Sequence, residues 1–341
     1  MTHVRIVRRI PPRFLLDVDF AIGPGITAVY GCYGAGKTVL LESIAGFTRP
    51  DSGRILLDDA ILFDAASHVQ LPPRRRFCGY VAQSDSLFPH MTVRRNLVFA
   101  ARRWPRLERH RRVLEMLDRF QLSAVAAAWP HSLDTPAKLR CSIARALLAE
   151  PRLLLLDECG AGESLLRQIR EVTQAPILFA TADLDLCCEA ADQMLLLDAG
   201  RILQRGAPRE VLDRPASLEA ARLLGVPNLF QASIAALDPV RNSSRLEFDH
   251  FTLTGPYIPG HLKGDRVWVA AAAESLRLRS GSPLPPNTAS LEFVRASYRA
   301  HSVLLEFSFG IFVTASHEEF ARRKDNKDWQ VEFPPEALRI L

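Results

Sequence analysis

The chain has 341 residues, 48% of them apolar, and this size and composition exclude a disordered protein and favour two folded domains. Its formal charge of +5 favours an anionic partner or surface without identifying one. No stretch reaches the roughly 18 apolar residues that a membrane-spanning helix needs, and the amino end lacks the apolar core of a signal peptide, so we expect any membrane role to come through a partner.

The first part of the chain is predicted to be an α/β domain. Apolar residues alternate from Phe14 and then run continuously to Tyr30, with a GPG turn between, which predicts a hairpin that leads into a buried strand. Helical periodicity over 91–150 predicts a helical insertion. Later apolar runs predict strands at 54–63, 152–158 and 176–181. The last two are predicted to be parallel strands that are covered on both faces.

The character of the sequence changes near residues 223–230. Beyond them, short strand patterns alternate with Gly, Pro, Asn and Ser, which predicts a small all-β barrel. The predicted domains are therefore an α/β domain over 1–226 and an OB-like β-barrel domain over 227–341.

The segment GCYGAGKT, Gly31 to Thr38, matches the phosphate-binding pattern GxxxxGK followed by Ser or Thr, between a predicted strand and helix. Glycines let the backbone N–H groups converge on phosphate oxygens, and the helix that follows adds its positive end. Lys37 is predicted to reach the β and γ phosphates and Thr38 to bind magnesium. The predicted nucleotide contacts are Gly31, Cys32, Tyr33, Gly34, Ala35, Gly36, Lys37 and Thr38.

The run LLLLDE, 153–158, is read as the companion of this turn rather than as an ordinary core strand. Its strand carries Asp157 to the edge of the sheet beside the phosphate turn, where the carboxylate can hold magnesium through water. Glu158 is predicted to polarise the attacking water as general base.

With these motifs in place, the chain resembles the ATP-binding subunits of ABC importers, and the subgroup that serves molybdate uptake in particular. The segments RPDSGRILLDDAILFD, LPPRRRFCGYVAQSDSLFPHMTVRRNL and SIARALLAEPRLLLLDE follow that family's order and spacing. The resemblance implies an ABC-type P-loop NTPase fold followed by a TOBE- or Mop-like barrel, ATP and Mg²⁺ as cofactors, and a second ATP-binding subunit and transmembrane permease subunits as partners.

The resemblance also implies roles for two further residues. Gln83 takes the place of the Q-loop glutamine, which contacts magnesium and water where the permease docks. Phe14 is the aromatic in reach of the adenine; the alternative, a plain strand-core residue, stays open. In the barrel, Ala272 and Ser275 stand where relatives carry an Arg-x-x-Asp pair, so no ligand residue for an oxyanion is assigned.

Three segments depart from the family pattern. The loop that should read LSGGQ is Leu133 to Ala137, in which Asp134 is negatively charged and Pro136 has no N–H to donate. Ala182 takes the place of the switch histidine, and a methyl group cannot hold a γ-phosphate. The segment CGAGES, 159–164, replaces the usual D-loop.

These departures leave two functions open. The first is an energy-coupling ATPase with weak hydrolysis that drives uptake of a small oxyanion, molybdate by resemblance. The second is a non-catalytic or regulatory nucleotide-binding subunit that pairs with an active ATPase. The arginine-rich stretch 102–119 is read as a solvated helix face rather than as a nucleic-acid site.

The predicted location is the cytoplasm, peripheral on the inner face of the plasma membrane. The six cysteines form no CxxC pair, which favours reduced thiols over a zinc or disulfide framework.

Overall fold

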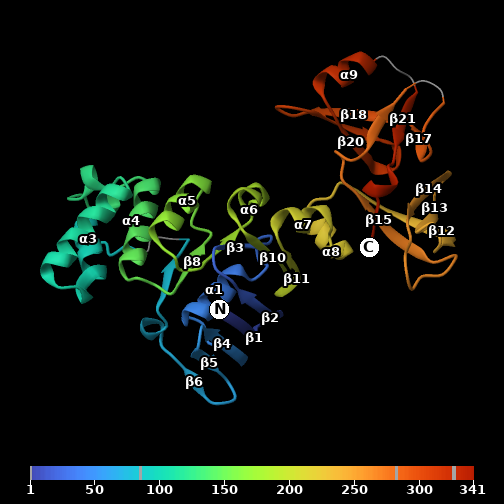
Figure 1. Cartoon of the computed structure of the whole chain (residues 1–341). Coiled ribbons are helices and arrows are strands. Elements are labelled where there is room, and N and C mark those ends of the chain that lie inside the picture. Colours follow the sequence, from blue (N-terminus) through green and yellow to red (C-terminus); the bar gives the residue numbers. More distant parts are fainter. Residues whose placement is uncertain (1, 84–86, 281–282, 325–327) are drawn as a thin grey trace. The chain divides into compact units, whose positions relative to one another are not determined.

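The structure is a computed structural model that describes residues 2–83, 87–280, 283–324 and 328–341. Its contacts separate the chain into two compact units, which meet in sequence between Asp213 and Arg214. The sequence-based domain ranges 1–226 and 227–341 remain predictions. Figure 1 shows the elements of each unit.

The first unit is built on one mixed sheet (Figure 1). Neighbouring strands are parallel from β10 to β7, and antiparallel pairs join β6, β5, β4, β1 and β2. In spatial order the strands are β6 (Val69–Gln70), β5 (Ala60–Asp64), β4 (Ser52–Leu57), β1 (Thr2–Ile10), β2 (Phe14–Ile22), β11 (Arg201–Gly206), β10 (Gln193–Asp198), β3 (Ile26–Tyr30), β9 (Ile177–Thr181), β8 (Leu153–Asp157) and β7 (Cys78–Val81).

The helices connect and flank these strands. The structure has α2, α3 and α4 within 91–150, where the sequence shows helical periodicity. The α-helices are α1 (Lys37–Ala45), α2 (Val93–Ala100), α3 (Arg106–Arg119), α4 (Thr135–Leu148), α5 (Glu163–Val172), α6 (Leu184–Ala190) and α7 (Pro208–Asp213), with short 3₁₀ turns at Pro73–Arg75, Ala101–Arg103, Ser123–Val125 and Pro130–Ser132.

The centre of the sheet forms as its sequence predicts. Every residue of β3, β8 and β9 is buried, because parallel strands are covered on both faces. The strands predicted at 152–158 and 176–181 are therefore confirmed as β8 and β9. Their carboxyl ends meet at one edge of the sheet, and the loop after β3 opens at that same edge.

Two local expectations were wrong. The strands on either side of the GPG turn do not form a hairpin: β2 pairs with β1, and β11 and β10 lie between β2 and β3. The run predicted as one strand over 54–63 is the hairpin β4–β5, which turns at Asp58 with a positive φ of 51°. In both cases apolar pattern located the strands, but long-range pairing and the turn decided their partners.

The second unit consists mainly of strands, as the sequence predicts. They form three sheets, in the orders β14-β13-β12-β15-β22, β16-β21-β17 and β18-β19-β20. The strands are β12 (Asn228–Asp238), β13 (Ser243–Phe248), β14 (Phe251–Pro256), β15 (Arg266–Ala271), β16 (Arg277–Arg279), β17 (Thr288–Leu291), β18 (Phe293–Tyr298), β19 (Val303–Phe307), β20 (Ile311–Ala315), β21 (Trp329–Glu332) and β22 (Arg339–Ile340).

One continuous apolar core joins these sheets, and Phe307, Val331 and Phe333 lie at its fully buried centre. The unit also contains two helices: α8 (Leu218–Leu223), which precedes the predicted barrel range, and α9 (His317–Arg323), which the all-β prediction for 227–341 did not include. Both begin at a serine whose hydroxyl accepts a backbone N–H bond, Ser217 in α8 and Ser316 in α9.

Candidate phosphate-binding site

The glycine-rich turn connects the end of β3 at Tyr30 to the start of α1 at Lys37. Gly36 occupies the N-cap position with a φ of 105°, and no side chain caps the helix. A side chain would not fit there, because a Cβ on Gly36 would lie 2.5 Å from Cζ of Phe14. The first turn of α1 therefore presents uncapped N–H groups and the positive end of the helix dipole, which together suit an anion.

Lys37 is held inside this turn. Its side chain is 4% exposed, and Nζ donates to the carbonyl oxygens of Gly31 at 2.6 Å and Cys32 at 2.9 Å. Nζ also pairs with Oε1 of Glu158 at 2.8 Å. A buried ammonium whose positive charge is directed into the turn suits an anion there.

Asp157 lies at the end of β8 and is 2% exposed. Its two carboxyl oxygens accept bonds from Thr38 Oγ1 at 3.1 Å and from the Tyr80 hydroxyl at 2.8 Å. Burial raises the pKa of Asp157, although the bonds from Tyr80 and Thr38 act against this rise. The carboxylate and hydroxyl oxygens are ligand types that Mg²⁺ prefers, so Thr38 and Asp157 fit a magnesium site.

Tyr80 is a site residue that the sequence analysis missed. It lies on β7 beside β8, in register with Leu155, and burial raises the pKa of its hydroxyl, which therefore stays a donor. Nothing in the segment GYVAQ distinguishes this tyrosine from a packing residue. Only the strand order β9-β8-β7 brings it to Asp157.

Glu158 and Gln83 both border two cavities beside the phosphate turn. Glu158 follows β8 with a positive φ of 42°, which turns its side chain back to Lys37. Gln83 follows β7 and is exposed. The smaller cavity, about 310 Å³, is lined by Ile10, Phe14, Tyr33, Gly34, Gly36, Lys37, Thr38, Val39, Gln83 and Glu158.

The predicted nucleotide contacts differ in accessibility. Tyr33 is 97% exposed and Cys32 is exposed, whereas Ala35 is buried. Phe14 lines the cavity and also packs, partly buried, against the core of the first unit, so both readings stay open. Its role toward adenine stays a prediction.

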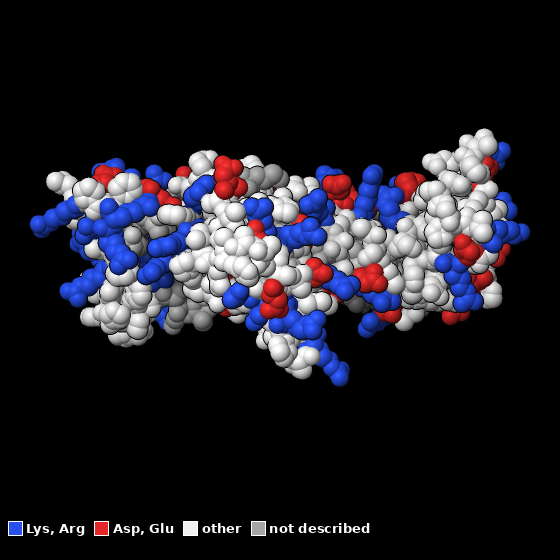
Figure 2. All heavy atoms as spheres, turned by 90° about the horizontal axis from the view of Figure 1, so that it is seen from below, with Lys and Arg blue, Asp and Glu red and all other residues white. Residues whose placement is uncertain are grey.

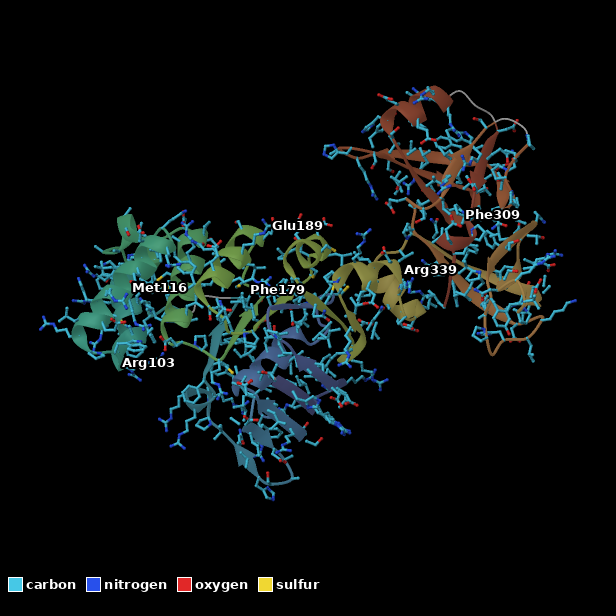
Figure 3. The ribbon with its side chains drawn as sticks, in the orientation of Figure 1. Arg103, Met116, Phe179, Glu189, Phe309 and Arg339 are labelled. Carbon is cyan, nitrogen blue, oxygen red and sulfur yellow. The ribbon has the colours of Figure 1, made fainter. Side chains whose placement is uncertain are left out.

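The larger cavity, about 830 Å³, shares Gln83 and Glu158 with the first. It is bordered by Ala182 and by the segment 159–163, two of the three places where the sequence departs from the family pattern. Figure 3 labels Phe179 and Glu189, which also line it. Ala182 brings only a methyl group to this wall, so it offers no hydrogen bond to a phosphate.

The third departure lies at the start of α4. Asp134 is the N-cap residue, and its Oδ1 accepts the N–H of Ala137 at 2.7 Å. Pro136 lies in the first turn and has no N–H. The chain's own carboxylate thus uses one donor of this helix end, and proline removes another.

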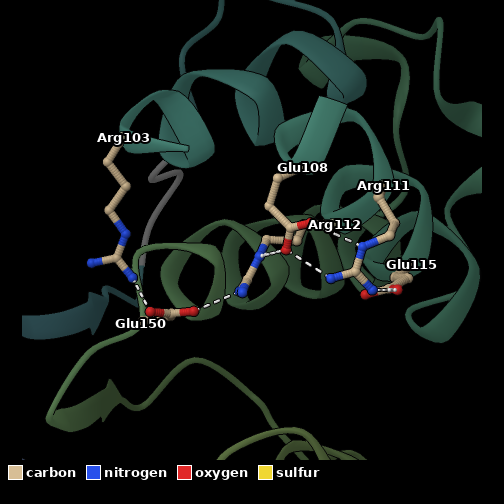
Figure 4. Close-up of polar contacts among 6 residues, drawn as sticks. All are labelled: Arg103, Glu108, Arg111, Arg112, Glu115 and Glu150. Atoms are coloured by element: carbon tan, nitrogen blue, oxygen red, sulfur yellow. Dashed lines mark hydrogen bonds and ion pairs between the residues drawn. The ribbon is translucent and has the colours of Figure 1, made fainter. Parts of the chain in front are cut away.

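The arginine-rich stretch forms ion pairs within the helical insertion. Figure 4 shows Arg111 and Arg112 on Glu108, and Arg112 and Arg103 on Glu150. The bonds from Arg111 and Arg112 lower the pKa of Glu108 to about 2. Figure 2 shows basic side chains gathered at the end of the first unit that α3 forms. The reading of this stretch as a solvated face stays a prediction.

Comparison with known proteins places this site in a family. The profile described as ABC transporter matches residues 15–161. The molybdenum import ATP-binding protein ModC of Rhodospirillum rubrum is 40% identical over 209 residues, covering 59% of this chain and 56% of the relative. The ModC protein of Paramagnetospirillum magneticum is 34% identical, covering 72% of this chain and 70% of the relative. The alignment with the first of these relatives thus spans little more than half of its length.

Relatives outside molybdenum import also match. The spermidine/putrescine import ATP-binding protein PotA of Vibrio cholerae is 34% identical, covering 77% of this chain and 71% of the relative. A solved ATP-binding subunit of an ABC transporter is 25% identical with a TM-score of 0.56, covering 66% of this chain and 99% of that chain. A dimeric ATP-binding cassette bound to ADP and phosphate, 20% identical with a TM-score of 0.53 over 61% of this chain and 99% of that chain, shares the fold.

These likenesses confirm the P-loop NTPase fold that the sequence predicts for the first unit. Over the described residues, we find no helix that is both long and apolar enough to cross a bilayer.

Proposed function

Because the chain belongs to the ATP-binding subunits of ABC importers, we propose that it binds MgATP and couples a weak hydrolysis of ATP to uptake of a small oxyanion. The observation that carries the proposal is the cluster of buried Lys37 and Asp157 with half-buried Glu158, beside the uncapped end of α1. Molybdate is the proposed solute, since several similar relatives bear the name of molybdenum import proteins. The similar spermidine/putrescine protein bears the name of a different solute.

Each cluster residue has a proposed role. On nucleotide entry Lys37 exchanges the carbonyls of Gly31 and Cys32 and the carboxylate of Glu158 for phosphate oxygens. Glu158, released from Lys37, then accepts a proton from the attacking water. Magnesium, when bound, would neutralise phosphate charge, and Thr38, Asp157 and Gln83 are the residues proposed to hold it.

Further parts of the proposal rest on the family. The chain acts with transmembrane permease subunits and a second ATP-binding subunit, and it lies peripherally on the inner face of the plasma membrane. The second unit is proposed to be an OB-like barrel with an oxyanion as its ligand, for which no ligand residue is assigned.

Two measurements on the purified chain test this proposal. ATP affinity is compared between the wild type and Lys37→Ala, with the exposed Lys263→Ala as control. Losing a buried charged hydrogen-bond donor costs about 2 kcal/mol or more, so affinity should fall about 30-fold or more in Lys37→Ala. Unchanged affinity in Lys37→Ala would contradict phosphate binding at this turn.

Steady-state ATPase is then measured alone and with the permease, beside Glu158→Gln. Turnover that disappears in Glu158→Gln supports the coupling ATPase. Tight ATP binding with turnover equal to that of Glu158→Gln supports the second candidate, a regulatory nucleotide-binding subunit that pairs with an active ATPase. The Asp134 cap on α4 is the observation that favours this second candidate.

A further inference from the structure

A charged side chain lies in the most protected part of the first unit. Arg76 is 0% exposed, and among the described residues it has the largest volume of the fully buried side chains. Its neighbours Arg74 and Arg75 are exposed. Among the described residues no carboxylate forms an ion pair with it, and its Nη2 has no hydrogen-bond partner. Burying a cation in this way costs free energy unless its surroundings compensate it.

The compensation comes from the carboxyl end of α1. Nη1 donates to the carbonyl oxygens of Ser43 at 2.7 Å and Ile44 at 2.9 Å, which belong to the last turn of that helix. Carbonyls there lack intrahelical partners and carry the negative end of the helix dipole. Gly46 makes room for the guanidinium, since a Cβ there would lie 2.5 Å from Nε of Arg76.

The same side chain also ties down the backbone that leads into β7. Nε donates to the carbonyl of Leu71 at 2.8 Å, and β7 begins at Cys78, two residues after Arg76 itself. Arg76 therefore joins two elements, α1 and the segment 71–78. It lies far from the phosphate turn, because Thr38 and Ile44 are about 9 Å apart along a helix axis.

Both elements contribute to the Asp157 cluster. Thr38 comes from α1 and Tyr80 from β7, and they donate to the two oxygens of one carboxylate. The ring of Phe47, just beyond α1, contacts Tyr80 edge-on with centroids 5.2 Å apart. A shift of α1 relative to β7 would thus lengthen one of the two bonds to Asp157.

We propose that Arg76 is a positioning residue that fixes α1 against β7, so that Thr38, Tyr80 and Asp157 keep the geometry of the magnesium site. The inference rests on the proposed function for its nucleotide readout only. Partners that orient metal ligands typically change metal affinity by about 10-fold to 100-fold when they are removed.

The test compares Arg76→Met, Arg76→Lys and the exposed control Arg75→Met in the full chain. ATP affinity is measured with and without Mg²⁺, and thermal unfolding is measured on the same samples. Arg76→Met should reduce the Mg²⁺-dependent gain in affinity about 10-fold while Mg²⁺-free ATP binding changes little. Arg76→Lys should recover part of that gain, and Arg75→Met should leave it unchanged.

A purely structural role predicts a different result. Affinity would then fall equally with and without Mg²⁺, in step with the loss of stability, and this outcome would overturn the proposal. If Arg76→Met does not fold, Arg76→Gln replaces it, because the neutral amide removes the charge and one of the two bonds to α1 and should produce the same selective loss.

Hydrogen exchange without nucleotide is the second readout. Arg76→Met should accelerate exchange in α1 and in β7 together, whereas acceleration confined to 71–76 would overturn the coupling. A wild-type chain that binds no ATP would refute the proposed function, and the exchange result would still decide the role of Arg76.

Discussion

The first unit contains two helix ends that we propose to lie near a nucleotide, and they are built in opposite ways. The amino end of α1 has glycine at its N-cap and no side-chain cap, whereas that of α4 is closed by Asp134 and interrupted by Pro136. The backbone N–H groups at the start of α1 are thus free to bind an anion, whereas at the start of α4 one N–H is bonded to a side chain of the same chain and another is missing. We therefore expect binding and turnover of a nucleotide to depend on different regions, which mutation can separate.

The first prediction tests whether the residues that depart from the family pattern, at the start of α4 and at Ala182, limit hydrolysis. In Asp134→Ser/Pro136→Gly/Ala182→His, the start of α4 regains a free donor and the larger cavity gains an imidazole. One preorganised donor to a transition state is worth about 100-fold to 1000-fold in rate, so turnover in the assembled transporter should rise at least about 100-fold. Phosphate release measures it, and adding Glu158→Gln should remove the gain. A repaired chain with unchanged turnover would show that these positions do not limit hydrolysis.

Asp157→Asn tests the region beside the start of α1, where we propose that Mg²⁺ binds. The amide can still accept from Tyr80 or Thr38, but it lacks the charge that binds Mg²⁺, so the Mg²⁺-dependent gain in ATP affinity should fall about 10-fold to 100-fold. Titration of ATP with and without Mg²⁺ measures this, and Asp118→Asn, at an exposed position of α3 that lines neither cavity, is the control. Equal affinities for MgATP in Asp157→Asn and the wild type would exclude Asp157 from the metal site.

The same variant makes a prediction about pH. Burial raises the folded-state pKa of Asp157, so the folded chain holds this proton to higher pH than the unfolded chain does. The ionised carboxyl therefore destabilises the fold above the raised pKa, and the penalty disappears below the ordinary value near 3.8. Asp157→Asn should melt at a higher temperature than the wild type at neutral pH, and this difference should shrink as the pH falls toward 4. A constant difference would contradict the assignment.

The sequence predicted the residues of the phosphate turn and of the strand beside it better than it predicted the residues that hold these segments in place. Residues 31–38 and 153–158 are local patterns whose spacing determines both structure and chemistry, so they could be located without the fold. Tyr80 and Arg76 could not, because their roles depend on which strand and helix pack against them. In the run PRRRF the three arginines look equivalent, and only the packing of Gly46 and α1 selects the buried one.

The start of α4 shows which features could and could not be predicted from the residues alone. The charge of Asp134 and the missing N–H of Pro136 are evident from the residues themselves. The bond from Ala137 is not, because it requires the helix to begin at Thr135. The partner of β2 was mispredicted for the same reason, since strand order is decided by contacts distant in sequence.

The smallest expected effect isolates the Asp134 cap itself. Asp134→Ala removes the bond to the N–H of Ala137 and should lower the free energy of unfolding by about 1 kcal/mol. ATP affinity of the isolated chain should not change, because Asp134 is not among the residues that line the cavity at the phosphate turn. Thr92→Ala at the start of α2, which removes a similar cap, is the matched control for stability. Urea unfolding of both variants measures the free energy of unfolding, and titration with ATP measures the affinity. If Asp134→Ala changed ATP affinity of the isolated chain while Thr92→Ala did not, the start of α4 would have to act on the phosphate turn within one chain, and the separation of the two regions would fail.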